Sequence, residues 1–265
     1  MTTARQRQIL EWLEREGAGS YPELAERLGV SAMTVRREVD RLAALGRVIK
    51  TLGGVQRADA PSYLMETAIH ARMGRNRVEK QAMARAAIAL AEGVETLFLD
   101  GSTTCLELAK LIARRLRGVT VVTNSALTAL ELGHSRNNTV VGVGGELDPN
   151  SCCFVGSVAE EAAERYFVDV AFVSTMGFLP AEGTFESTVA NFRVKQILAR
   201  HARRVALLVD HSKFGQRALA RVLATDEIDV VVTDEATTEA DVAALVAAGI
   251  DVLRGASSKE DAHVA

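Results

Sequence analysis

The chain has 265 residues, and its 31 Lys and Arg residues against 34 Asp and Glu residues give a formal net charge of −3. A composition of 48% hydrophobic and 25% charged residues is ordinary for a folded chain and excludes disordered, collagen-like and disulfide-rich proteins. The apolar runs are far shorter than the ~20 residues of a membrane helix, and no signal peptide is evident. We therefore expect a cytoplasmic protein of two unequal domains without a membrane partner.

The three cysteines, Cys105, Cys152 and Cys153, do not form the pattern of a disulfide framework. The five histidines are scattered along the chain, and no Cys or His spacing typical of a zinc site occurs. The sequence therefore predicts neither a bound metal nor a cofactor.

Charge is distributed unevenly between the N-terminal segment and the rest of the chain. Residues 1–57 carry ten Lys and Arg residues against seven Asp and Glu residues, a net charge of +3, whereas the remainder carries −6. A basic segment on an acidic body suggests that only the first segment meets a polyanion such as nucleic acid.

The basic segment has the periodicity of three short helices followed by a hairpin. The first helix is predicted around residues 9–13, the second from a capping box at residues 20–23, and the third from Ser31. Only Gly29 and Val30 separate the last two helices, and residues 48–57 form a hairpin, or wing, around two glycines. This arrangement predicts a winged helix-turn-helix.

The third predicted helix carries short polar residues at its start and arginines on its outward face. Such a helix enters the major groove with its start, and its arginines reach guanine edges or phosphates. The alternative is a solvated charged face, because Glu38 and Asp40 lie among the arginines. The residues that we expect to contact DNA are Ser31, Thr34, Arg36, Arg37, Arg41, Lys50 and Thr51.

In the body of the chain, short runs of Val, Leu and Ile alternate with helical stretches, beginning with an Ala-rich helix at residues 79–92. This alternation predicts an α/β fold with a largely parallel sheet, in which ligands bind at the carboxyl ends of strands. The predicted strands are residues 96–99, 120–123, 139–143, 168–173, 205–209, 228–233 and 250–253.

Polar turns follow four of these strands. The turn at residues 100–104 leads into a helix and offers backbone N–H groups, hydroxyls and the positive end of a helix dipole, as a phosphate group requires. It is not a Walker loop, because no Gly-Lys-Ser/Thr follows. Residues 123–125 and 144–145 form similar turns, and residues 210–213 add a lysine. The alternative is that residues 102–104 only cap the helix and that Lys213 only pairs with Asp210.

These features resemble the DeoR family of bacterial repressors. Residues 31–39, followed by Leu45-Gly46 and Gly53-Gly54, resemble its N-terminal signature, although most members have Asp where this chain has Glu38. The polar turns resemble the DeoR sensor domain, which is similar in fold to ribose-5-phosphate isomerase and related phosphosugar-binding proteins. The resemblance implies a repressor of carbohydrate metabolism genes whose operator binding is modulated by a phosphorylated sugar or a related metabolite.

The resemblance also assigns roles to residues. It implies that Thr103 and Thr104 hold the phosphate and that Lys213 counters its charge. Asp100 and Asp169 would take sugar hydroxyls, although a structural role is equally open for Asp169. The effector-binding residues so predicted are Asp100, Gly101, Ser102, Thr103, Thr104, Thr123, Asn124, Ser125, Gly144, Gly145, Asp169 and Lys213.

The rival hypothesis is a sugar-phosphate isomerase with an attached DNA-binding module. Such isomerases carry a Lys on a glycine-rich loop and a Glu immediately before a helical Lys. Here the corresponding loop, residues 179–183, has no Lys, and Val194 precedes Lys195. Glu182 and Glu186 remain candidate bases. We nevertheless expect binding without turnover, and therefore no enzyme and no catalytic residue.

The expected organisation has four parts. They are a winged helix-turn-helix domain at residues 1–57, an interdomain connector at 58–78, an α/β effector-sensing domain at 79–256 and a frayed tail at 257–265. Helix-turn-helix proteins read two half-sites of double-stranded operator DNA, so we expect a homodimer or homotetramer.

Overall fold

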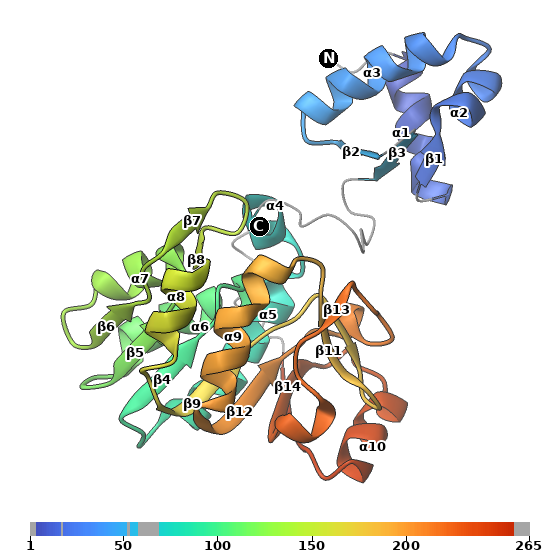
Figure 1. Ribbon diagram of the computed structural model, residues 1–265. Helices are drawn as coiled ribbons and strands as arrows, with labels where there is room; N and C mark the ends of the chain where they lie inside the picture. Colours follow the sequence, from blue (N-terminus) through green and yellow to red (C-terminus); the bar gives the residue numbers. More distant parts are fainter. Residues whose placement is uncertain (1–3, 17, 52–53, 58–68, 257–265) are drawn as a thin grey trace. The chain divides into compact units, whose positions relative to one another are not determined.

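The structure is a computed structural model that describes residues 4–16, 18–51, 54–57 and 69–256. The chain divides into two compact units, residues 1–62 and residues 63–265 (Figure 1). The predicted tail and residues 58–68 of the predicted connector lie outside the described residues.

The first unit has the predicted winged helix-turn-helix fold. In its core, the inward apolar residues of the helices pack against Val48 and Val55 of the sheet. These helix residues include Ile9, Leu24 and Val39. The sheet is antiparallel with the order β1-β3-β2. The elements are α1 (Ala4–Glu16), β1 (Ala18–Ser20), α2 (Tyr21–Leu28), α3 (Ala32–Ala44), β2 (Val48–Thr51) and β3 (Gly54–Arg57).

Strand β1 is an element that the sequence did not predict. Its residues Ala-Gly-Ser carry no β-branched or aromatic side chain, so local preference gives no strand signal. The strand forms because Gly19 pairs with Val55 of the wing, a contact between residues far apart in the chain. Residues 52–53, at the tip of the predicted hairpin, lie outside the described residues.

The second unit confirms the predicted α/β class. Its seven-stranded parallel sheet has the order β15-β14-β12-β9-β4-β5-β6, and the central strands are buried, as helices on both faces require. The strands are β4 (Thr96–Leu99), β5 (Thr120–Thr123), β6 (Thr139–Gly142), β9 (Val168–Val173), β12 (Ala202–Leu208), β14 (Val230–Asp234) and β15 (Asp251–Gly255).

Helices cover both faces of this sheet (Figure 1). On one face, α5 and α6 bury Met83 and Leu108 against the strands. On the other face, α8 and α9 bury Ala159 and Leu198. The helices are α4 (Ile69–Gly74), α5 (Arg77–Ala87), α6 (Thr103–Arg115), α7 (Ala126–Gly133), α8 (Ser157–Ala163), α9 (Val189–Arg200) and α10 (Glu239–Ala247), with 3-10 turns η1 (Ile88–Ala91), η2 (His211–Lys213) and η3 (Thr225–Glu227).

Short strands outside the main sheet complete the second unit. A hairpin of β7 (Glu146–Asp148) and β8 (Cys153–Val155) lies between β6 and α8 in the chain. A separate antiparallel sheet has the order β10-β11-β13 and consists of β10 (Gly177–Leu179), β11 (Gly183–Glu186) and β13 (Ala220–Arg221). The hairpin β7–β8 follows β6, β10 and β11 follow β9, and β13 follows β12 and η2. These short strands therefore lie near the carboxyl ends of the strands of the seven-stranded sheet.

The direction in which the sheet grows reverses between β4 and β9. From β4 the chain continues outward through β5 and β6, whereas from β9 it continues through β12, β14 and β15 on the other side. Ligands of open α/β sheets bind beside such a reversal, at the carboxyl ends of the strands. Asp100 and Ser174 directly follow β4 and β9, so their surroundings define the candidate site.

Part of the predicted connector, residues 58–78, is structured and belongs to the second unit. Ile69, in α4, is 2% exposed, and its N–H donates to the carbonyl oxygen of Asn150 at 2.8 Å. The Lys80 ammonium donates to the carbonyl oxygens of Arg72 and Arg75 at 2.6 and 2.5 Å. These bonds fix the end of α4 against α5. Burial of the ammonium lowers the pKa of Lys80 to about 8.

Candidate functional site

Helix α3 and its cap carry five of the seven residues that we predicted to contact DNA, and strand β2 of the wing carries the other two. Ser31 caps the helix, because its Oγ accepts a hydrogen bond from the Thr34 N–H at 3.2 Å and lies 2.9 Å from the Thr34 hydroxyl oxygen. Val35 is fully buried on the inner face, whereas Arg36 and Arg37 are exposed on the outer face. This face combines a polar helix start with arginines, as a recognition helix requires.

The arginines of α3 differ in their surroundings. The guanidinium carbon of Arg36 lies 5.2 Å from the ring centroid of Tyr21, a cation–π contact that orients it. Arg41 pairs with Glu38 at 3.1 Å. Arg37 makes no hydrogen bond or ion pair with any residue that the structure describes. Its guanidinium is therefore available to a base edge or a phosphate.

Glu38 does not belong to a solvated face. It is 7% exposed and accepts a hydrogen bond from the Gln6 side-chain amide at 2.8 Å, which ties α1 to α3. In the wing, the Lys50 ammonium pairs with Asp40 at 2.8 Å, and this hydrogen bond raises the pKa of Lys50. Thr51 is the last residue of β2.

In the second unit, Asp100 follows β4 at the reversal and is fully buried. One carboxylate oxygen accepts the Ser102 N–H at 2.9 Å, and the other accepts the Ser174 N–H at 2.8 Å and lies 3.0 Å from the Lys195 ammonium. Burial alone would raise the pKa of Asp100, but the Lys195 charge and these hydrogen bonds hold it below its usual value. Asp100 shapes the turn, so the sugar-hydroxyl role implied by the resemblance does not fit its occupied oxygens.

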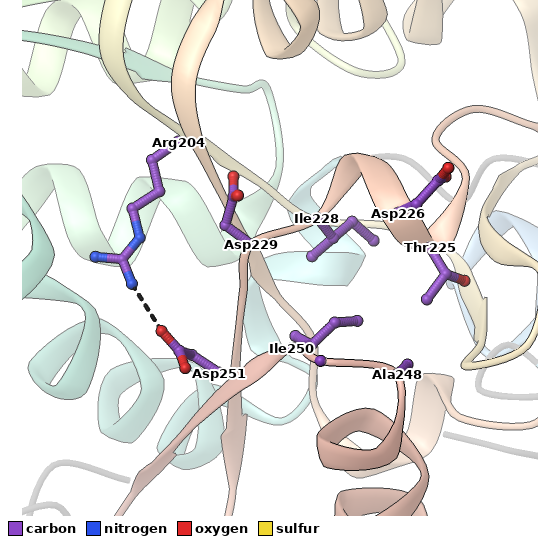
Figure 2. A pocket seen from close by; sticks show the side chains of 9 residues that line it. Arg204, Thr225, Asp226, Ile228, Asp229, Ala248, Ile250 and Asp251 are labelled. Atoms are coloured by element: carbon purple, nitrogen blue, oxygen red, sulfur yellow. Dashed lines mark hydrogen bonds and ion pairs between the residues drawn. The ribbon is translucent and has the colours of Figure 1, made fainter.

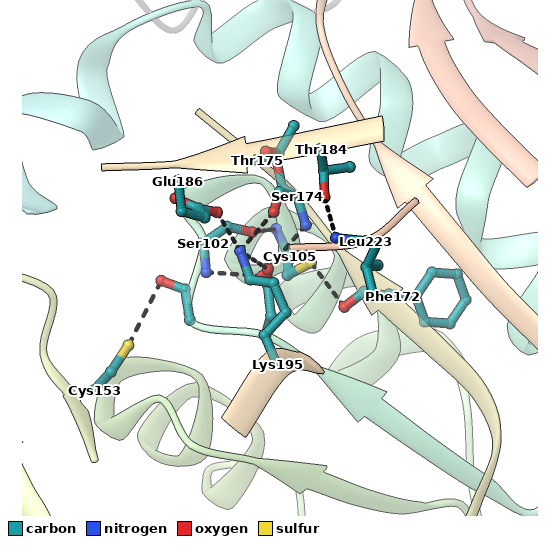
Figure 3. Close-up of polar contacts among 12 residues, drawn as sticks. Ser102, Cys105, Cys153, Phe172, Ser174, Thr175, Thr184, Glu186, Lys195 and Leu223 are labelled. Carbon is teal, nitrogen blue, oxygen red and sulfur yellow. Dashed lines mark hydrogen bonds and ion pairs between the residues drawn. The ribbon is translucent and has the colours of Figure 1, made fainter. Parts of the chain in front are cut away.

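Lys195 of α9 stands at the centre of this cluster (Figure 3). Its ammonium donates to a Glu186 carboxylate oxygen at 2.5 Å and to the Ser174 carbonyl oxygen at 2.6 Å. Burial raises the pKa of Glu186. Burial alone would lower the pKa of Lys195, but the carboxylates of Asp100 and Glu186 hold the Lys195 pKa above its usual value. Two carboxylates against one ammonium do not attract an anion, so the cluster holds the turn in place and does not itself bind phosphate.

The sequence did not identify Lys195 and Glu186 as site residues. They lie on α9 and β11, and only the tertiary fold brings both to Asp100. One signal was present, since Lys195 interrupts an inward apolar face that includes Val194 and Leu198. A lysine inside such a face requires a buried partner, but the sequence does not say which one.

The start of α6 has the geometry of an anion site. Ser102 caps the helix by accepting the Cys105 N–H on its Oγ at 3.0 Å. The N–H groups of Thr103 and Thr104 belong to the first turn, where helix geometry supplies no intrahelical partner. Thr103 and Thr104 are 7% and 4% exposed, whereas Gly101 and Ser102, which precede them in the chain, are half-buried. An anion would therefore approach over Gly101 and Ser102.

The turn after β5 lies beside the turn after β4. The Thr123 hydroxyl donates to the last carbonyl oxygen of β4 at 2.7 Å and accepts the Ser125 N–H at 3.1 Å. Ser125 caps α7 with its own hydroxyl. Asn124 is 3% exposed, and its side-chain oxygen lies next to Gly101. The structure thus brings the first and second predicted turns together.

The glycines of the third predicted turn, after β6, have different surroundings. Gly145 has a φ of +140°, and a Cβ there would lie 2.8 Å from the Val155 carbonyl oxygen and 2.9 Å from the Ala159 Cβ. This glycine allows β8 and α8 to approach closely. Gly144 is exposed, and a Cβ there would meet nothing within 4 Å.

Lys213 and Asp169 follow or belong to strands other than β4. Lys213 is in η2 after β12, and β9 separates β12 from β4 in the sheet. Asp169 lies at the opposite, amino-terminal edge, where it accepts the N–H groups of Glu95 and Thr96 at 3.2 and 3.0 Å and the Thr96 hydroxyl at 2.8 Å. These bonds lower the pKa of Asp169. Asp169 therefore has the structural role, and the predicted contact with a sugar hydroxyl is wrong.

A cavity of about 430 Å³ opens at this amino-terminal edge (Figure 2). Arg204 and Asp251 line it and pair with each other at 3.0 Å. Asp229, also in the lining, accepts the Val205 N–H at 2.7 Å and so connects two strands. The cavity holds none of the predicted effector residues.

The cysteines of the second unit are separate thiols. Cys105, Cys152 and Cys153 are free, and burial raises the pKa of Cys153 to about 12. Within the described ranges, no group of three or more His, Cys, Asp or Glu residues could hold a metal ion. None of the helices described is long and apolar enough to cross a membrane.

A winged helix-turn-helix unit joined to an α/β unit with polar carboxyl-end turns is the architecture of a DNA-binding transcriptional regulator. Residues 5–60 match the family model of the DeoR-like helix-turn-helix domain, and residues 75–235 match that of the DeoR C terminal sensor domain. The chain belongs to the DeoR family of transcriptional regulators.

Relatives of known description agree with this assignment. The chain is 31% identical over 230 residues to the HTH-type transcriptional regulator GolR of Listeria innocua, covering 87% of this chain and 89% of that protein. It is 28% identical over 232 residues to the glycerol-3-phosphate regulon repressor of Escherichia coli (strain K12), covering 88% and 90%. A D-ribose-5-phosphate isomerase in complex with phospho-erythronic acid aligns with a TM-score of 0.39 and 16% identity, covering 51% of this chain and 52% of that chain.

Proposed function

We propose that the chain represses genes of carbohydrate metabolism and that a phosphorylated sugar or a related metabolite modulates its operator binding. One relative is named for the glycerol-3-phosphate regulon and another, 26% identical over 252 residues, for the aga operon. Glycerol 3-phosphate, after which the first regulon is named, is a phosphate ester, and the start of α6 favours a ligand of that chemistry.

The observation that carries the effector assignment is the start of α6 at the reversal between β4 and β9. The helix dipole places partial positive charge there, and the N–H groups of Thr103 and Thr104 are donors that a phosphate oxygen satisfies. A neutral hydroxyl supplies no charge to meet that dipole. Lys213 approaches from the β12 side and counters the remaining charge of the phosphate. Asp100, held by Lys195, fixes the turn before the ligand arrives.

On the DNA side, α3 enters the major groove, and Arg36 and Arg37 contact base edges or phosphates. One such unit, with a net charge of +3 over residues 1–57, makes few phosphate contacts at physiological salt. We therefore propose that a homodimer or homotetramer binds repeated half-sites. The effector changes operator affinity through a coupling of about 1–3 kcal/mol, a factor of roughly 5–150 in the dissociation constant.

The test uses operator DNA that the full-length protein selects from a random duplex library. Fluorescence anisotropy then gives the dissociation constant of that DNA with phosphate esters of sugars and with the same sugars unphosphorylated. We expect roughly 5–150-fold changes with an active ester and none with its free sugar. Lys213→Ala should bind the DNA normally and lose this response.

Lys110→Ala is the matched control, because Lys110 pairs with Glu107 two turns away from the start of α6 and should respond as the wild type does. The effector assignment is wrong if free sugars act as well as their esters. A Lys213→Ala variant that responds normally removes Lys213 from the site.

A further inference from the structure

A buried side-chain oxygen beside the start of α6 has no hydrogen-bond partner. It is Oδ1 of Asn124, a residue that is 3% exposed. The rest of Asn124 is engaged: Nδ2 donates to the Phe154 carbonyl oxygen at 3.3 Å, and the Asn124 carbonyl oxygen accepts the Phe154 N–H at 2.7 Å. An unpaired buried acceptor destabilises a fold, so its presence requires an explanation.

The unpaired oxygen faces the proposed effector site. It lies 3.9 Å from the position that a Cβ of Gly101 would occupy, and Gly101 precedes the cap of α6. The Cys153 sulfur lies on the same side and would overlap that Cβ. Burial raises the pKa of Cys153 to about 12, so this neighbour stays a neutral thiol. Two neighbouring turns therefore supply N–H donors at the start of α6 and an unpaired amide oxygen acceptor after β5.

This pair of features distinguishes among ligands. Inorganic phosphate at neutral pH mainly needs donors, which the start of α6 supplies. A phosphate ester of a polyol also carries hydroxyl hydrogens, and a hydroxyl near the phosphate would supply the donor that Asn124 lacks. An alkyl phosphate of the same length has the charge but no hydroxyl, and it would leave the acceptor unpaired.

We propose that Asn124 is a specificity-determining residue, whose Oδ1 accepts a hydrogen bond from a ligand hydroxyl while the ligand phosphate lies at the start of α6. This inference rests on the proposed effector function. The oxygen is covered in the structure, so the ligand hydroxyl enters with a local shift of Cys153 and strand β8. Sites built to bond a hydroxyl reject analogues that lack it, and we expect a preference of roughly 10–100-fold.

The experiment compares hydroxylated and plain phosphate esters by isothermal titration calorimetry on the full chain. The hydroxylated probes are glycerol 3-phosphate, ribose 5-phosphate and fructose 6-phosphate, and the plain probes are propyl, pentyl and hexyl phosphate. The wild type should bind at least one hydroxylated ester roughly 10–100-fold more tightly than its plain partner. Asn124→Leu, which removes the acceptor at similar size, should reduce this ratio to near one while plain esters still bind.

Asn124→Asp keeps an acceptor oxygen and serves as the second variant. Its added charge should weaken all phosphate esters together, but the preference for the hydroxylated ester should persist. Thermal unfolding of both variants without ligand checks that they fold. If Asn124→Leu does not fold, a loss of preference in Asn124→Asp overturns the inference and a retained preference supports it.

The remaining outcomes separate the two proposals. If no hydroxylated ester binds the wild type, both the effector proposal and the role of Asn124 are overturned. If hydroxylated esters bind and Asn124→Leu keeps the full preference, the effector proposal stands and the role of Asn124 is wrong. Equal binding of plain and hydroxylated esters to the wild type also overturns the role of Asn124, because the oxygen then meets no ligand hydroxyl.

Discussion

Replacing Lys195 by Met tests whether the buried ion cluster holds the candidate site together. The Lys195 ammonium lies 2.5 Å from Glu186 and 3.0 Å from Asp100, and its side chain is 11% exposed. At 3 Å and an effective dielectric constant of about 20, each attraction is worth roughly 5 kcal/mol before desolvation is subtracted. Removing one partner of a buried pair costs about 3–5 kcal/mol, because it leaves uncompensated charge inside the fold.

The assay is urea unfolding of the Lys195→Met variant and the wild type between pH 8 and pH 5. In the wild type, the depressed pKa of Asp100 contributes stability that is present at neutral pH and lost as the pH falls through that pKa. Without Lys195, burial raises the pKa of Asp100 above its unfolded value, and that of Glu186 further still. The folded variant then binds more protons than the unfolded chain, so its deficit should shrink from pH 8 toward pH 5.

Arg204→Met is the matched control, since Arg204 forms a pair with Asp251 at 3.0 Å in which both side chains are exposed, 43% and 75%. It should cost no more than about 1 kcal/mol and show no comparable pH trend. A loss of under about 1 kcal/mol at pH 8 in the Lys195→Met variant would show that the ion cluster does not stabilise the site, because a broken buried pair costs more than that. A deficit that stays constant down to pH 5 would contradict the expected rise in the pKa of Asp100.

Three further predictions concern other parts of the molecule. Gly101→Ala should lower the free energy of unfolding by about 1–3 kcal/mol, because the new methyl group overlaps the Cys153 sulfur; adding Cys153→Ala should recover part of the loss in thermal unfolding. Asp169→Asn should reduce stability, most clearly above pH 5, and leave ester binding by calorimetry unchanged, because Asp169 lies at the opposite edge of the sheet. Arg37→Ala should weaken binding to selected operator DNA by about 1–3 kcal/mol if Arg37 contacts a base. Lys50→Ala should weaken binding to all duplexes alike and reduce the slope of log affinity against log salt concentration by about one. Fluorescence anisotropy measures both effects.

Local features of the sequence determined the fold class and the position of the polar turns. Ser31 caps α3 and Ser102 caps α6 as their neighbours in the chain predict, because a cap depends on residues three positions apart. The alternation of apolar runs with helices predicts a parallel α/β sheet for the same reason, since each element is encoded within a few residues. The resemblance to the DeoR family rested on such short segments.

The tertiary structure decided which residues meet. The strand order put β9 beside β4, so Lys195 and Glu186 reached Asp100, although no spacing in the sequence connects them. Asp169 is the second residue of β9 and therefore lies at the opposite, amino-terminal edge, where the predicted strand at residues 168–173 already placed it. Strand β1 exists only through its pairing with the wing. Contacts between residues distant in the chain depend on the register and order of strands, and these follow from the packing of the whole unit.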